Sequence, residues 1–305
     1  MGTTIKDLLA KNSAFPRKSL GQNFLTDKNI LKKIIETADI SPNDIILEIG
    51  SGTGILTQEL AKKAKKVIAV EKDAKMVEIL KEELMSFKNV EVIQADILKI
   101  ENLELFKNLK YKPVASLPVI ARQLTKIGNY KIVANLPYYI TSSVIRKFLE
   151  IKKQPKLMVL MVQKEVARRI VAKPPDMNLL AVSVQFYAKP EIIKHVSKKS
   201  FWPEPKVDSA ILRIAPLISA DKKLTNTDLF FKIVKAGFSQ PRKQLVNNLS
   251  RLNFSSKNYG GQAKSSTLNR NKINNWLLKN KIQPTQRAET LTIEDWKNLT
   301  KTFGN

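Results

Sequence analysis

The sequence predicts an α/β fold, a parallel sheet with helices, followed by a smaller and mostly helical carboxyl-terminal domain. Three observations support this fold class. Short apolar runs that are typical of buried strands alternate with segments of helical periodicity. A loop with the sequence Glu-Ile-Gly-Ser-Gly-Thr-Gly follows the first of these runs, at residues 48–54. From residue 229 to residue 288 there are twelve Lys or Arg and no Asp or Glu, so the composition changes late in the chain.

The length and charge of the chain point to two domains and a polyanionic partner. The 305 residues are 43% hydrophobic, which is enough to bury a core. The 53 Lys and Arg outnumber the 27 Asp and Glu and give a net charge of +26. We expect a catalytic domain over residues 1–215 and a basic helical domain that binds nucleic acid over residues 216–305. A basic surface that only faces water is the alternative.

The composition also excludes several classes of site. The chain has no cysteine and a single histidine, His195, so disulfides, thiolate sites and histidine metal sites are not expected. No apolar run approaches the ~20 residues of a membrane span, and the first fifteen residues lack a signal-peptide core. We therefore expect a cytoplasmic protein without a metal, and a monomer by default.

The predicted elements follow one another as strand and helix. A first helix is capped by Thr26 or Asp27 and ends near Ile40. The predicted strands are residues 44–49, 66–71, 90–93, 131–134, 157–162, 191–196 and 207–214, and the helices between them are residues 55–65, 76–84 and 163–172. Because parallel strands end at one edge of a sheet, we expect the polar residues that follow them to meet there.

The glycine loop predicts a nucleotide-like cofactor. Gly50, Gly52 and Gly54 allow a tight turn between strand and helix and a close approach of the backbone to a ligand. Dehydrogenases that bind NAD prefer the spacing G-x-G-x-x-G, whereas here the third glycine comes one residue earlier and Glu48 precedes the loop. The pattern favours S-adenosylmethionine over NAD.

Two acidic residues end the next strands. Glu71 lies 21 residues after the first glycine, where a carboxylate can accept hydrogen bonds from both ribose hydroxyls. Asp96 can accept a hydrogen bond from the adenine amino group of the cofactor. An exposed carboxylate with no role is the alternative for each residue.

The segment Asn135, Leu136, Pro137 and Tyr138 predicts methylation of an exocyclic amine. The adenine N6 lone pair is delocalised into the ring, so the nitrogen is a poor nucleophile. The Asn135 side-chain oxygen and the Leu136 carbonyl can accept both N6 hydrogens and stabilise the positive charge that develops. Pro137 stiffens the turn, and Tyr138 can stack on an extruded base.

At this point the chain resembles the ribosomal RNA adenine dimethyltransferase family, specifically its small-subunit KsgA (RsmA) branch. The resemblance covers residues 19–249. Its motifs are Leu-Gly-Gln-Asn-Phe-Leu at residues 20–25, the glycine loop, Asn-Leu-Pro-Tyr-Tyr-Ile-Thr-Ser at 135–142, Met-Val-Gln-Lys-Glu-Val-Ala at 161–167, Phe-Trp-Pro-Glu-Pro-Lys-Val-Asp-Ser-Ala at 201–210 and Gly-Phe-Ser-Gln-Pro-Arg-Lys at 237–243.

The resemblance implies the site residues and the substrate. It places S-adenosylmethionine contacts at Asn23, Leu25, Gly50, Glu71, Asp96 and Asn135, and a second stacking surface for the adenine at Phe201. The implied product is N6,N6-dimethyladenosine at two adjacent adenosines near the 3′ end of small-subunit (16S) rRNA, formed in an assembling 30S subunit. The segment at residues 106–129 is longer than the family pattern. We favour a tolerated surface insertion, because lengthening a loop costs little; the alternative is that its lysines and arginine add an rRNA contact.

Four other functions stand as alternatives. An antibiotic-resistance type of methyltransferase would act on one adenosine of large-subunit rRNA. A non-catalytic rRNA-binding assembly factor would keep the pocket without using it. An NAD-dependent oxidoreductase is disfavoured by the glycine spacing and by the charge, and DNA adenine methyltransferases usually carry a target-recognition domain with no counterpart here.

Overall fold

The computed structural model describes residues 4–99, 129–151, 153–217, 226–254, 266–267 and 270–303. These residues form two compact units, one of residues 1–168 and 188–216 and the other of residues 169–187 and 217–305. The five basic residues expected to give the long segment an rRNA contact (Lys107, Lys110, Lys112, Arg122 and Lys126) lie outside the described residues.

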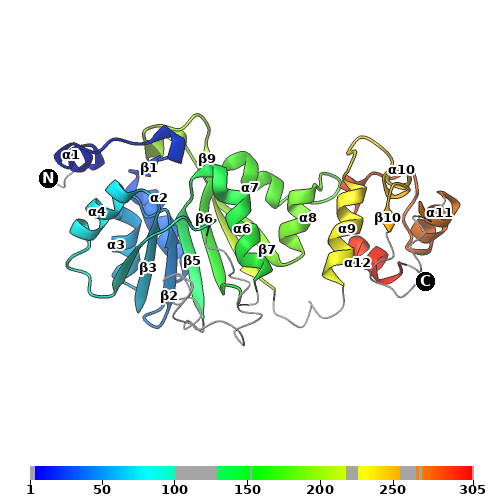
Figure 1. The fold of residues 1–305 in the computed structure, drawn as a ribbon, viewed down its shortest axis with the longest axis horizontal. Coiled ribbons are helices and arrows are strands. Elements are labelled where there is room, and N and C mark those ends of the chain that lie inside the picture. Colours follow the sequence, from blue (N-terminus) through cyan, green and yellow to red (C-terminus); the bar gives the residue numbers. More distant parts are fainter. Residues whose placement is uncertain are drawn as a thin grey trace. The chain divides into compact units, whose positions relative to one another are not determined.

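The first unit is built on a seven-stranded sheet with the strand order β4-β3-β2-β5-β6-β9-β7 (Figure 1). The five strands from β4 to β6 run parallel, and β9 pairs antiparallel with both β6 and β7. The strands are β2 (Ile45–Ile49), β3 (Lys66–Glu71), β4 (Val90–Gln94), β5 (Tyr130–Asn135), β6 (Leu157–Gln163), β7 (Ala188–Val196) and β9 (Ser209–Pro216). All seven predicted strands are present, and the antiparallel edge is an addition to the parallel sheet that we expected.

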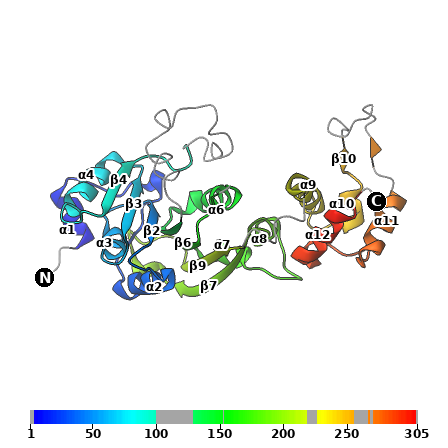
Figure 2. The ribbon, with the colours of Figure 1, turned by 90° about the horizontal axis from the view of Figure 1, so that it is seen from below.

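Helices cover both faces of this sheet, with α2 and α6 on opposite sides (Figure 2). The helices of the unit are α1 (Ile5–Lys11), α2 (Lys28–Ala38), α3 (Ile55–Ala61), α4 (Ala74–Glu83), α6 (Thr141–Glu150) and α7 (Lys164–Ile170), with 3-10 turns η1 (Lys18–Leu20), η4 (Tyr138–Ile140) and η5 (Lys198–Ser200). Asp27 caps α2 by accepting hydrogen bonds from the amides of Asn29 and Ile30, as predicted. The predicted helix at residues 55–65 is shorter and ends at Ala61.

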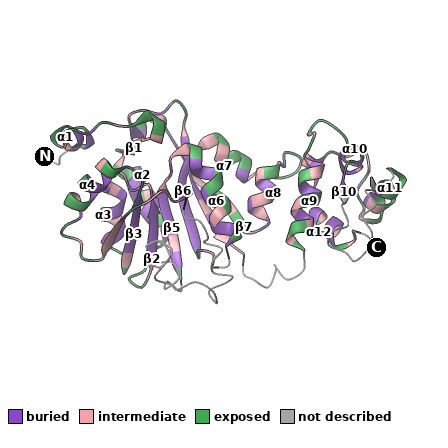
Figure 3. Cartoon of the chain, viewed as in Figure 1, coloured by how far each residue is buried: buried purple, intermediate pink, exposed green. Residues whose placement is uncertain are grey.

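The central strands are buried on both faces, as a sheet covered on two sides requires (Figure 3). All of β6 except Gln163 is buried, and its alternate residues Val159 and Met161 pack with α2 and α3. A two-stranded pair, which the sequence did not predict, joins β1 (Phe24–Leu25) to β8 (Phe201–Trp202). This pair ties the amino-terminal segment to the segment before β9, next to the carboxyl edge of the sheet.

The second unit is mostly helical and has its own apolar core. Its elements are α8 (Leu179–Gln185), α9 (Thr227–Gly237), α10 (Leu245–Leu249), α11 (Arg270–Lys279), η7 (Ala288–Thr290), α12 (Ile293–Lys301) and the strand pair β10 (Asn253–Phe254) and β11 (Ser266–Thr267). Phe186, Phe230 and Trp296 are buried together at its centre. The unit differs from the predicted second domain because it also contains residues 169–187, whose apolar face on α8 packs against α9.

Two kinds of feature are absent from the residues that the structure describes. No helix there combines the length and the apolar character needed to cross a membrane. Among the same residues, no group of three or more histidine or acidic side chains is arranged to hold a metal ion.

Candidate active site

A cavity at the carboxyl edge of the sheet gathers most of the predicted site residues, and we call it the main cavity. Its walls come from the segment before α2, the glycine loop and the ends of β3, β4 and β5. The predicted residues that line it are Asn23, Leu25, Gly50, Gly52, Glu71, Asp96, Asn135, Leu136, Pro137 and Tyr138. Two predicted residues, Gly54 and Phe201, do not line it.

The glycine loop connects β2 to α3 and packs closely against its surroundings. Gly52 has φ +55°, and a Cβ there would lie 3.1 Å from Cε1 of Phe24. Gly54 has φ +85° and begins α3, and its Cβ would lie 2.7 Å from a methyl carbon of Leu80. Gly54 is therefore required by the turn and by packing against α4, and it does not line the main cavity.

Glu71, at the end of β3, is held by three backbone amides. Its Oε2 accepts a hydrogen bond from the Gly52 amide at 2.9 Å. Its Oε1 accepts hydrogen bonds from the amides of Lys72 at 2.7 Å and Asp73 at 2.9 Å. The carboxylate is 7% exposed, so this network orients it toward the cavity and links it to the glycine loop.

Asp96 follows β4 and forms an ion pair that the sequence reasoning missed. Lys72 Nζ lies 3.0 Å from Asp96 Oδ2, and the Leu98 amide donates to Asp96 Oδ1 at 3.0 Å. Burial alone would raise the pKa of Asp96, but the hydrogen bonds from Lys72 and Leu98 and the lysine charge lower it below its usual value. Lys72 directly follows Glu71 at a strand end, which is the signal that could have identified it.

Asn135 ends β5 with its side chain fixed by one hydrogen bond. Its Nδ2 donates to the backbone oxygen of Asn23 at 3.1 Å. This hydrogen bond orients the amide group, whose acceptor atom is Oδ1. The next amide, that of Leu136, donates to the Met161 oxygen at 3.2 Å and ties the turn to β6. Pro137 follows with φ −55° and accepts a hydrogen bond from the Ile140 amide at 3.1 Å.

Tyr138 lies half-buried at the same turn. Its hydroxyl and the Ser209 hydroxyl are 2.7 Å apart, so the ring is anchored to the first residue of β9. Burial raises the pKa of Tyr138, and the nearby charge of Asp208 adds to this increase. The side chain is therefore a neutral phenol at physiological pH, which suits a stacking surface and not a base.

The structure places Phe201 outside the main cavity. It is 4% exposed and belongs to the core between the sheet and α2. Phe201 also pairs with Leu25, a residue of the cavity lining, in the β1–β8 ladder. Its role as a second stacking surface for the adenine stays a prediction.

Glu48 is a second buried glutamate in the main cavity, and the predicted site did not include it. It is 1% exposed and accepts a hydrogen bond from the Thr57 hydroxyl. Burial raises its pKa to about 8, against the opposing effect of that hydrogen bond. Its position directly before the first glycine was visible in the sequence, but its protonation follows from burial, which the sequence does not display.

Comparisons with known proteins agree on one family. The model of the family described as ribosomal RNA adenine dimethylase matches residues 14–303. A protein of Dehalococcoides mccartyi named ribosomal RNA small subunit methyltransferase A is 41% identical over 96% of this chain and 90% of its own length. A protein of the same name from Anoxybacillus flavithermus is 38% identical over 98% of this chain and 94% of its own length.

Two solved structures share the fold over almost the whole chain. A dimethyladenosine transferase from Plasmodium falciparum is 29% identical, with a TM-score of 0.71 over 90% of this chain and 95% of its own. The 23S rRNA methyltransferase ErmE is 25% identical, with a TM-score of 0.64 over 93% of this chain and 100% of its own. From the family match and the 41% identity, this chain belongs to the ribosomal RNA adenine dimethylase family.

Proposed function

We propose that this protein uses S-adenosylmethionine to dimethylate N6 of two adjacent adenosines near the 3′ end of small-subunit rRNA. The observation that carries the proposal is the position of Asn135. Its side chain lies in the same cavity as the glycine loop and Glu71, and it presents an oxygen fixed by the hydrogen bond from Nδ2 to Asn23. A cofactor-binding carboxylate and an acceptor for amine hydrogens are thus at one site.

The residues of the main cavity fit S-adenosylmethionine. Glu71 presents a carboxylate at the end of β3, where ribose hydroxyls can donate to it, and the amides that hold it leave it oriented. Asp96 presents a second acceptor at the end of β4. When bound, the cofactor supplies an electrophilic methyl group. We also assign Asn23, Leu25, Gly50 and Gly52 to cofactor binding, because they line the same cavity as Glu71 and Asp96.

The Asn-Leu-Pro-Tyr turn would prepare the adenine nitrogen. Oδ1 of Asn135 and the Leu136 carbonyl accept the two N6 hydrogens and stabilise positive charge on the nitrogen. The turn is held by the hydrogen bond from the Leu136 amide to Met161, so these acceptors need little reorganisation. Tyr138 would stack on the extruded base, and its raised pKa keeps it from acting as a base. The proton can leave after methyl transfer, so positioning carries the catalysis.

The relatives favour the small-subunit substrate over the large-subunit alternative. The proteins named small subunit methyltransferase A are up to 41% identical to this chain, whereas the 23S methyltransferase ErmE is 25% identical. We further propose that a monomer acts on rRNA in an assembling 30S subunit in the cytoplasm, and that the second unit binds this rRNA. The support for the last point is its charge, because twelve Lys or Arg and no acid occupy residues 229–288.

A labelling experiment separates this function from its alternatives. The protein is incubated with labelled S-adenosylmethionine and with small or large ribosomal subunits that lack base methylation. We expect label in small-subunit rRNA alone. Label in large-subunit rRNA would favour the resistance type of methyltransferase, and no label in either would favour a non-catalytic assembly factor.

A further inference from the structure

A second hollow in the first unit is lined mainly by cations, and we call it the cation hollow. It lies where β6 passes into α7 and where η5 and the segment before β9 approach that junction. Its charged lining residues are Lys164, Arg168, Lys198, Lys206, Glu165 and Asp208. These are four cations against two carboxylates, and one net positive charge remains when Glu204, which pairs with Lys198, is also counted, so the hollow favours an anionic ligand.

The contacts in the hollow show which cations are already paired. Lys198 Nζ lies 2.9 Å from Glu204 Oε1, which neutralises this lysine. Lys164 Nζ lies 3.7 Å from Asp208 Oδ2, and the Lys198 amide donates to Asp208 Oδ1 at 3.1 Å. One oxygen of Asp208 therefore faces the ammonium of Lys164 and the other accepts a backbone hydrogen bond, so its charge is balanced locally.

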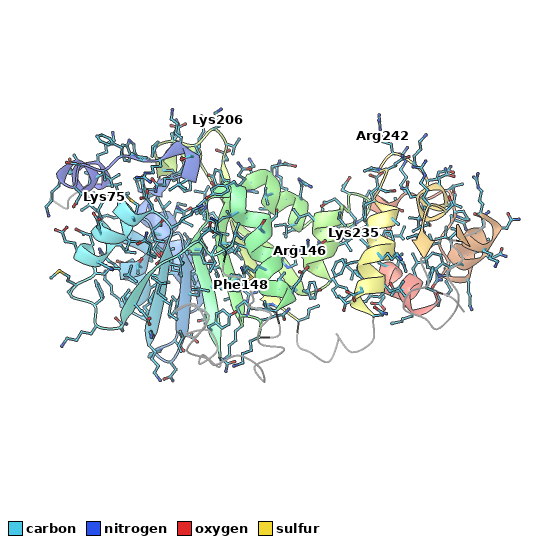
Figure 4. All side chains as sticks on the ribbon, viewed as in Figure 1. Lys75, Arg146, Phe148, Lys206, Lys235 and Arg242 are labelled. Atoms are coloured by element: carbon cyan, nitrogen blue, oxygen red, sulfur yellow. The ribbon has the colours of Figure 1, made fainter. Side chains whose placement is uncertain are left out.

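The other two cations are exposed and lack such partners. Neither Arg168 nor Lys206 has a carboxylate oxygen within 4.0 Å among the described parts of the chain. Figure 4 labels Lys206, whose side chain extends outward from the loop before β9. A guanidinium and an ammonium that share one hollow, without carboxylates of their own, match the charge and the acceptor oxygens of a phosphate group.

The position of the hollow indicates which phosphate it would bind. Asp208 lines the hollow, and the next residue, Ser209, holds the hydroxyl of Tyr138 at 2.7 Å. Ser209 also pairs with Gln163, which lines the hollow from β6. The hollow and the anchor of the aromatic ring in the main cavity thus involve two adjacent residues of the chain. We propose that Arg168 and Lys206 bind a backbone phosphate of the RNA strand next to the adenosine held at Tyr138, an inference that rests on the proposed function.

The physical role of such a contact is to hold the strand while the base is extruded. Unstacking a nucleotide costs free energy, and a fixed phosphate beside the base offsets part of that cost and limits the positions of N6. The contact carries no sequence information, because every nucleotide has the same phosphate. Arg168 and Lys206 are therefore positioning residues, separate from the acceptors at Asn135 and Leu136.

The test compares the double variant Arg168→Ala/Lys206→Ala with a control of equal charge, Lys63→Ala/Lys88→Ala. Both control lysines are exposed and precede β3 and β4, so they lie at the opposite edge of the sheet. Affinity for small subunits that lack the methyl groups is measured over a salt series, together with kcat/KM for methyl transfer. The affinity of each variant for S-adenosylmethionine, measured by calorimetry, checks that the main cavity is intact.

We expect kcat/KM of the Arg168→Ala/Lys206→Ala variant to fall about tenfold or more, with unchanged affinity for S-adenosylmethionine. The slope of log Kd against log salt should decrease by about 0.7, the value for one phosphate of a single strand. The charge-preserving variant Arg168→Lys/Lys206→Arg should recover most of both quantities, and the Lys63→Ala/Lys88→Ala control should resemble the wild type.

Two results would overturn the inference. One is a double variant that matches the Lys63→Ala/Lys88→Ala control in both slope and kcat/KM. The other is a charge-preserving variant that remains as weak as the alanine pair, since this would point to shape and not to charge. Wild-type protein that transfers no methyl group would instead reject the proposed function, so the two failures are distinguishable.

Discussion

The main cavity and the cation hollow lie at the same edge of one sheet but present opposite chemistry. The main cavity presents acceptors, namely the carboxylates of Glu71 and Asp96 and the amide oxygen of Asn135. The cation hollow presents donors, of which Arg168 and Lys206 have no carboxylate partner among the described residues. One scaffold thus presents acceptors suited to hydroxyl and amine hydrogens on one side and donors suited to phosphate oxygens on the other, with Tyr138 near the boundary.

The largest effect is expected from removing the acceptor at the reacting nitrogen. Asn135→Ala should lower kcat by about 10²–10³-fold, because the lost interaction forms with a charge that develops in the transition state. Binding of small subunits should change little, since the cation hollow is untouched. Single-turnover methyl transfer and a binding assay measure the two quantities, and near-normal turnover would remove Asn135 from its assigned role.

The next effect concerns the cofactor side of the main cavity. Glu71→Gln removes a charge that accepts three amide hydrogen bonds, and we expect S-adenosylmethionine to bind about 10- to 100-fold more weakly. Glu78→Gln is the matched control, because Glu78 is exposed on α4 and, among the described residues, its one ion pair is with Lys75 on the same helix. Calorimetry gives both affinities, and equal values for the two variants would contradict the role of Glu71.

A third prediction separates stacking from anchoring at Tyr138. Tyr138→Ala removes the ring and should lower kcat/KM about tenfold or more, in line with ~1–3 kcal/mol for a base stacked on an aromatic side chain. Tyr138→Phe keeps the ring and loses only the hydrogen bond to Ser209, so the expected loss is a few-fold. If both substitutions were equally harmful, the hydroxyl would matter more than the stacking surface.

Local sequence patterns predicted the sheet and most of the main cavity, but not the contacts between distant segments. The strands, the glycine loop, Glu71, Asp96 and Asn135 follow from local patterns, because parallel strands deliver their last residues to one edge. The burial of Phe201 could not be predicted in the same way, because it belongs to a core formed with Leu25, 201 − 25 = 176 residues away in the chain. Residues 169–187 were assigned to the first domain because no local pattern reveals that α8 packs on α9.

The charged groups were predicted less completely than the backbone. Lys72 and the cations of the hollow are ordinary lysines and arginines in a chain that has 53 of them. Their significance comes from which carboxylates they meet, and this is decided by contacts between distant elements. Lys206 and Arg168 are 38 residues apart and approach only because β9 returns to pair with β6.

The smallest predicted effect concerns the stability of the protein and tests whether Glu48 in the main cavity is protonated. Burial raises the pKa of Glu48 from 4.5 to about 8, so the folded protein binds a proton that the unfolded chain releases. Stability should therefore fall as pH rises from about 4.5 to about 8. The neutral variant Glu48→Gln lacks this loss and should gain about 2–4 kcal/mol relative to wild type between pH 5 and pH 8.

Thermal unfolding of wild type and Glu48→Gln at pH 5, 6, 7 and 8 measures this difference in stability. The large net charge of the protein affects the stability of both proteins nearly equally, so it cancels in the comparison. If the difference in stability between the two proteins stayed constant with pH, Glu48 would be ionised over the whole range from pH 5 to pH 8. Such a result would give the main cavity a second fixed negative charge and would weaken its contrast with Asp96, whose pKa is lowered by Lys72.

The most direct measurement is the chemical identity of the methylated nucleoside. Small subunits that lack the modification are treated with the protein and labelled S-adenosylmethionine, and the rRNA is digested to nucleosides and mapped. The proposed function predicts N6,N6-dimethyladenosine at two adjacent positions near the 3′ end. Label on another base would contradict the assignment of Asn135 and Leu136 to an adenine amine, and monomethyladenosine alone would contradict dimethylation.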